Sequence, residues 1–180
     1  MNKNGLSLKN LTLTQTALLC SVALVVSFAE SLFPYVLPIP GAKLGLSNII
    51  TAVAIDSVGF ISGLCIVFVK ALFALLTRGF LAGVMSFSGS MLSMVVMYFL
   101  IRDNRHLFGY LGIGVSGALA HNTGQFFVSR FVCGKAVIYY IPVLLAISAL
   151  MGSLNGIALG LLSPVSTKVL RMINSHKKQT

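Results

Sequence analysis

LFPYVLPIPGAKLGLSN, residues 32–48, separates two strongly apolar segments and contains three of the chain's five prolines. Proline fixes its own φ torsion and has no backbone N–H to donate, so Pro34, Pro38 and Pro40 cannot lie together in one regular helix. We therefore expect a stiff, irregular loop, followed by a helix that begins near Leu44. The first helix of the chain must end before this loop.

The same loop carries one charged side chain, that of Lys43. We interpret the loop as a lid over a ligand site at one membrane face, with Lys43 as its charged contact. The alternative is a rigid turn between two membrane spans, in which Lys43 extends to the membrane surface. The predicted lid positions are Pro38, Pro40, Gly41 and Gly45.

Composition predicts an integral membrane protein. Hydrophobic residues make up 57% of the chain and charged residues 9%, whereas a soluble domain carries about 25% charged residues. The mean hydropathy is +0.96. No polar stretch is long enough for a second unit, so we expect one all-α domain over residues 1–180 in the cell membrane. The net charge of +10 does not indicate nucleic-acid binding, because most of the Lys and Arg residues lie at the ends of apolar segments.

Six apolar segments are long enough, or nearly so, to cross a bilayer, which takes about 20 helical residues. The second and third would together form a helix of roughly 50 Å, too long for one span. We place a break at residues 56–59, where a polar pair precedes Gly59. The predicted spans cover residues 11–33, 44–58, 60–76, 80–101, 108–132 and 137–162.

The distribution of basic residues predicts the topology. With six spans and a cytoplasmic N-terminus, eight basic residues face the cytoplasm and four face outward, with Lys70 inside the third span. If the second and third segments formed one span, five basic residues would face the cytoplasm and seven would face outward. The positive-inside rule therefore favours a six-helix membrane bundle with both termini cytoplasmic.

Polar side chains inside membrane spans are costly and are candidate functional groups. His121 and Gln125 are four residues apart and share a helix face. The alternative is structural, because an amide between membrane helices contributes only about 0.6 kcal/mol, and Lys70 could be neutralised by Glu30 or Asp56. The candidate ligand-binding residues within the spans are Asn48, Lys70, His121, Asn122, Gln125 and Asn155.

Four cations fall on the predicted outer face, namely Lys43, Arg78, Arg130 and Lys135. No acidic residue accompanies them in the outer loops, so they would attract an anionic ligand. Contact with lipid headgroups is the alternative.

Known catalytic signatures are absent from the sequence. There is no phosphate-binding loop ending in GK[ST], so the chain cannot itself hydrolyse ATP. Its three acidic residues are too scattered to hold Mg²⁺ as a pair. Cys20, Cys65 and Cys133 have no metal-ligand spacing. We expect no enzyme activity, no metal and no cofactor.

The stretch PGAKLGLSNIIT, residues 40–51, resembles the Gx transporter family, which is also labelled heptaprenyl diphosphate synthase component I. GALAHNTGQ at 117–125 and YYIP at 139–142 resemble the same family's fifth and sixth spans. This family is similar to the substrate-binding S-components of energy-coupling factor (ECF) vitamin transporters. The resemblance implies a six-helix bundle that captures a micronutrient and engages a T-component and ATPases. It also implies a partner-contact face on the first span, here Ala23-x-x-x-Ser27, although small residues at this spacing serve equally well for packing inside the bundle.

We therefore expect a non-catalytic substrate-capture subunit of an ECF-type importer for a small anionic micronutrient or precursor, in contact with membrane lipid. The alternative is a non-catalytic membrane subunit of a quinone/isoprenoid or flavin-linked redox assembly. A purely structural membrane anchor would bind no small ligand.

Overall fold

The computed structural model describes residues 3–32, 45–103 and 109–176 of the chain, and in this part every regular element is a helix. The all-α prediction is therefore confirmed. The elements are α1 (Lys3–Ser31), α2 (Ser47–Ser57), α3 (Phe60–Arg78), α4 (Phe80–Arg102), α5 (Tyr110–Cys133), the 3-10 helix η1 (Gly134–Tyr140) and α6 (Ile141–His176).

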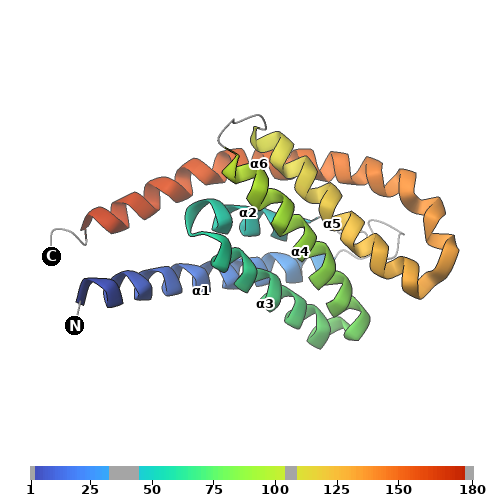
Figure 1. Cartoon of the computed structure of the whole chain (residues 1–180), viewed down its shortest axis with the longest axis horizontal. Coiled ribbons are helices and arrows are strands. Elements are labelled where there is room, and N and C mark those ends of the chain that lie inside the picture. Colours follow the sequence, from blue (N-terminus) through green and yellow to red (C-terminus); the bar gives the residue numbers. More distant parts are fainter. Residues whose placement is uncertain (1–2, 33–44, 104–108, 177–180) are drawn as a thin grey trace.

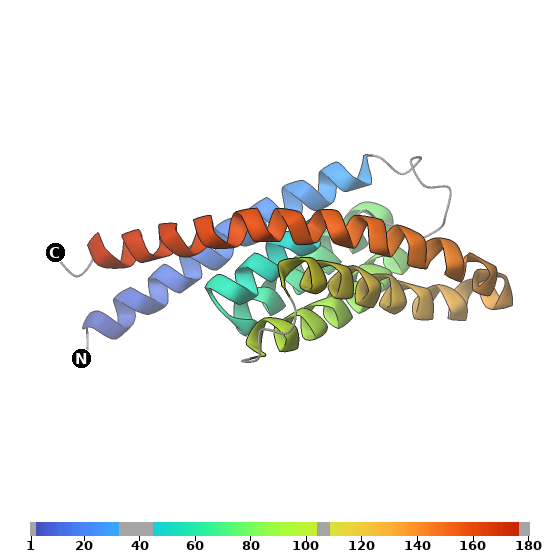
Figure 2. The same cartoon turned by 90° about the horizontal axis from the view of Figure 1, so that it is seen from above.

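Successive helices run in opposite directions along the long axis of the molecule (Figure 1). The start of α1 and the end of α6 lie at the same end of the molecule, and a view from above shows the same placement (Figure 2). The end of α3 and the start of α4 lie toward the opposite end. This arrangement fits an even number of membrane crossings, and the side on which the two termini lie stays a prediction.

Four helices of the described chain are long and apolar enough to cross a membrane, over Thr12–Ser31, Phe60–Arg78, Phe80–Arg102 and Ile141–Pro164. Helix α2 has 11 residues and is therefore about 16 Å long, about half of the bilayer's hydrocarbon core. Helix α5 has 24 residues and is long enough to cross, but its polar side chains make it less apolar than these four helices. The six predicted segments all correspond to helices, and four of them qualify as spans by length and composition.

The predicted break between the second and third segments is confirmed. Helix α2 ends at Ser57 and α3 begins at Phe60. Between them, Gly59 has a φ of 126°, a backbone conformation that residues with a Cβ rarely adopt. The largest departure from the predicted bounds is in α6, which continues past residue 162 to His176 and passes through Pro164.

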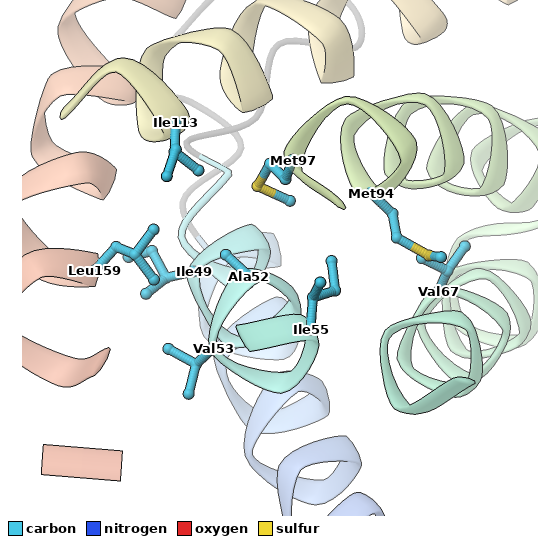
Figure 3. Close-up of a cluster of buried hydrophobic side chains, with 9 residues drawn as sticks. All are labelled: Ile49, Ala52, Val53, Ile55, Val67, Met94, Met97, Ile113 and Leu159. Carbon is cyan, nitrogen blue, oxygen red and sulfur yellow. The ribbon is translucent and has the colours of Figure 1, made fainter. Parts of the chain in front are cut away.

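Helix α2 is the centre of the bundle and contacts each of the other α-helices. A helix in this position buries side chains on all sides, and most residues of α2 are buried, including the polar Ser47, Asn48 and Thr51. Figure 3 shows its side chains meeting those of α3, α4, α5 and α6. The buried cluster consists of Ile49, Ala52, Val53, Ile55, Val67, Met94, Met97, Ile113 and Leu159.

Helices α5 and α6 pack closely along a line of glycines. A Cβ atom placed on Gly114 would lie 2.3 Å from the backbone N of Gly156 and 2.5 Å from the backbone O of Gly152. Only residues without a side chain allow two backbones to approach this closely. The glycines of these two helices therefore serve internal packing.

Candidate polar site inside the helical bundle

The N-terminal end of α2 lies within the bundle. Its first residue, Ser47, donates hydrogen bonds to an acidic side chain from α1. The backbone N–H of Ser47 donates to Oε1 of Glu30 over 3.3 Å, and the Ser47 hydroxyl donates to Oε2 over 3.1 Å. The first N–H groups of a helix have no partner within the helix and carry partial positive charge. Glu30 therefore stabilises this helix end, a contact that the sequence did not predict.

Lys70 of α3 is buried beside this helix end, with 2% of its surface exposed. Its ammonium group donates to Oδ1 of Asn48 over 3.0 Å. Glu30 lies close enough to act electrostatically on both Lys70 and Arg78. A buried ammonium needs such partners, because removing a charge from water costs several kcal/mol, on the order of a whole domain's net stability.

Asn155 brings α6 to the same place. Its Nδ2 atom donates to the backbone oxygen of Gly45 over 3.2 Å. Gly45 immediately precedes the first turn of α2 and has a φ of 73°. Asn48 and Asn155 line one small cavity of about 10 Å³, which is room for about one water molecule. The structure thus brings together three of the predicted ligand-binding residues, Asn48, Lys70 and Asn155.

The predicted cluster on α5 divides between two neighbouring helices. His121 and Gln125 both face α4, where a Cβ on Gly89 would lie 3.0 and 2.9 Å from their side chains. The prediction that these two residues share a face is confirmed. Asn122 faces α6 instead, and its Nδ2 atom donates to the Ser148 hydroxyl over 2.6 Å.

Several buried polar atoms in this interior have no hydrogen-bond partner within the described ranges. Leaving a buried donor or acceptor unpaired costs about 1–3 kcal/mol, so native proteins have few of them. Their concentration here indicates water or a ligand inside the bundle. These atoms include Asn48 Nδ2, Asn155 Oδ1, both amide atoms of Gln125, and the hydroxyls of Ser90 and Ser93.

The serines of α4 were missed by the sequence predictions. Ser86, Ser90 and Ser93 are buried, and their spacing of four and three residues places them on one face of α4. A Cβ on Gly117, which lines the small cavity, would lie 3.4 Å from Oγ of Ser93. The serine spacing is the signal that could have revealed this polar face.

The remaining predicted residues lie elsewhere. Arg78 is exposed at the end of α3. Ala23 and Ser27 are buried within the chain's own bundle, where Ala23 packs with Ala54 of α2 and Ile66 of α3. In the structure, these two residues therefore pack inside the bundle. Lys43, Pro38, Pro40 and Gly41 lie outside the described residues, as does the side chain of Lys135.

A second polar group lies at the other end of α2. The Ser163 hydroxyl donates to Oδ2 of Asp56, and the Tyr110 hydroxyl donates to Oγ of Ser163 over 3.3 Å. Asp56 and Tyr110 border a cavity of about 270 Å³ whose other walls include Ile113 and Leu159. Within residues 3–32, 45–103 and 109–176, no group of three or more His, Cys, Asp or Glu residues could hold a metal ion.

Together, these features define an all-helical protein with four helices long and apolar enough to cross a membrane, in which buried polar side chains surround the start of a short central helix. Comparison with protein families assigns the chain to one family. The profile described as heptaprenyl diphosphate synthase component I matches residues 19–162. The chain belongs to this family. No curated protein matches the chain, and no solved structure matches it either.

Proposed function

We propose that this protein is a membrane-embedded capture subunit that binds a small polar molecule inside its helical bundle. The observation that carries the proposal is the set of buried polar atoms without partners inside the bundle, at the start of α2 and on the face of α5 that packs against α4. Asn48, Asn155 and Gln125 are each at least nine-tenths buried and have amide atoms without partners among the described residues. A complementary ligand would satisfy them.

The charge of the site favours a ligand with a negative group. Lys70 supplies a buried ammonium, and only one hydrogen bond from it, to Asn48, is seen within the described part of the chain. An ammonium group has three hydrogens to donate, so it can also bind an anionic group. Arg78 and Arg130 lie near the ends of α3 and α5 and would attract an anion to this end of the bundle.

The similarity to ECF S-components gives this capture a role in import. In that reading the helical segments form six spans with both termini in the cytoplasm. The chain would itself be non-catalytic, and a T-component with ATPases would supply the energy. The absence of a phosphate-binding loop from the sequence supports a separate source of ATP hydrolysis.

A second function is favoured by the family's description and by a groove on the surface. The description names a component of a prenyl diphosphate synthase. Leu119 and Phe126 of α5 and Leu144 and Leu145 of α6 line an open, mostly apolar groove of about 100 Å³, which offers apolar contact to part of an isoprenoid chain. The chain would then be a non-catalytic membrane subunit of a quinone/isoprenoid or flavin-linked redox assembly.

Native mass spectrometry of the gently purified protein tests both functions. We expect a bound polar anion at one copy per chain and its loss in Lys70→Gln, which keeps a donor for Asn48 but removes the charge. Arg102→Gln is the matched control, because it removes one positive charge from an exposed residue bonded to Tyr98. A prenyl lipid or quinone bound equally to both variants would favour the second function. A polar ligand retained in Lys70→Gln would contradict the site assignment.

A further inference from the structure

We infer that the captured molecule carries an amide-like edge, meaning an N–H donor beside a carbonyl acceptor as in a lactam, and that Asn48 and Asn155 recognise this edge. This inference rests on the proposed capture function and specifies the class of ligand. It follows from the hydrogen bonds that these two asparagines already make, which determine the direction in which each side-chain amide is oriented.

The orientation of Asn48 is determined by Lys70. An ammonium group can only donate hydrogen bonds, so the atom of Asn48 that faces Lys70 Nζ at 3.0 Å must be the oxygen. The other amide atom of Asn48 is therefore the nitrogen, a donor. This Nδ2 atom is buried and has no acceptor among the described residues.

The orientation of Asn155 is determined in the opposite sense by Gly45. A backbone carbonyl can only accept hydrogen bonds, so the atom that faces Gly45 O at 3.2 Å must be the Asn155 nitrogen. The other amide atom of Asn155 is the oxygen, an acceptor. It too is buried without a partner within residues 3–32, 45–103 and 109–176.

Both asparagines line the same cavity, which therefore presents one unpaired donor and one unpaired acceptor. A carboxylate offers only acceptors and would leave the Asn155 oxygen unpaired, whereas an ammonium would leave the Asn48 nitrogen unpaired. A lactam edge satisfies both groups at once. Because the cavity has room for about one water, its walls must separate to admit such a molecule.

The test uses three probes of similar size with the full-length protein in lipid nanodiscs, followed by saturation-transfer NMR. The probes are 2-piperidone, which has the N–H and C=O edge, N-methyl-2-piperidone, which lacks the donor, and valerate, which offers acceptors only. We expect 2-piperidone to bind, and the N-methylated probe to bind at least about tenfold more weakly, since it leaves the Asn155 oxygen unpaired.

The variant Asn48→Asp keeps the oxygen that accepts from Lys70 and replaces the unpaired donor with an acceptor. We expect it to weaken 2-piperidone binding about tenfold or more, with thermal unfolding measured alongside to check that it is folded. The wild-type comparison of the two piperidones tests the inference even if this variant does not fold.

Three results would overturn the inference. Equal binding of the two piperidones would show that the N–H donor, and with it the Asn155 oxygen, plays no part in recognition. If valerate bound and 2-piperidone did not, the site would take an anion through Lys70. The proposed capture function would then still hold. Binding of none of the probes would indicate a site for water, and the mass spectrometry of the purified protein would then decide the capture function separately.

Discussion

The packing of α5 against α6 predicts a large effect from one added methyl group. In Gly114→Ala, the new Cβ would lie 2.3 Å from the Gly156 nitrogen and 2.5 Å from the Gly152 oxygen. Real Cβ contacts are essentially never shorter than 3.0 Å, so the helices must separate by about 0.7 Å or more to relieve the closest contact. Overpacking of this kind costs about 1–3 kcal/mol. Because the opposing atoms are backbone and cannot rotate away, we expect the upper end of that range.

Gly160→Ala is the matched control, since it adds the same methyl group to the same pair of helices. Its nearest neighbour is the Tyr110 ring at 3.5 Å, an ordinary contact. Replacing a helical glycine with alanine gains up to about 1 kcal/mol of helix propensity, which offsets part of the cost in Gly114→Ala and should leave Gly160→Ala neutral or stabilised. The free energy of unfolding by SDS in mixed micelles, followed by circular dichroism, measures the difference. If Gly114→Ala were as stable as Gly160→Ala, the close approach of these backbones would be refuted.

Three further changes test other contacts by the same measurement. Glu30→Gln keeps an acceptor for Ser47 but removes the negative charge from the start of α2 and from the surroundings of the buried Lys70, so we expect a loss of at least about 0.5–1 kcal/mol, which is the helix-end contribution alone; an unchanged stability at low salt would argue against charge stabilisation by Glu30. Gly45→Ala places an L-residue at a φ of 73°, which costs about 1–2 kcal/mol, and wild-type stability would contradict that backbone conformation. Ser148→Ala removes the acceptor of Asn122 and should cost about 0.6 kcal/mol, with an upper limit of about 1.7 kcal/mol; a larger loss would mean that Asn122 has a further role.

Much of the fold was predictable because apolar length and glycine position are local signals. The break before Phe60 follows from the length limit on a membrane helix and from a polar pair preceding Gly59. The end of α6 was not predictable from apolar length, because the helix continues beyond the apolar stretch through Pro164 to His176. The short central helix was visible as a short segment, but its burial on all sides depends on the packing of the other helices.

The candidate site was predictable only in part. The spacing of His121 and Gln125 correctly placed them on one face of α5. The hydrogen-bond partners of Lys70 and Asn155 were not predictable. Glu30 was one of two acidic residues considered as a neutralising neighbour of Lys70 and does act on it electrostatically, but the hydrogen bond of Lys70 goes to the Asn48 amide. Pairing between distant residues depends on how helices cross, and a single sequence carries no signal for that geometry.

The short length of α2 has a consequence for how the protein is made. A helix of about 16 Å cannot span the hydrocarbon core by itself, so its place in the membrane depends on the helices that pack around it. Lys70 follows Asn48 by 22 residues and is available early. Asn155 follows Gly45 by 110 residues and arrives with the last helix. The polar interior is therefore complete only once α6 has been made, and a chain that ends before α6 would lack the Asn155 contact to Gly45.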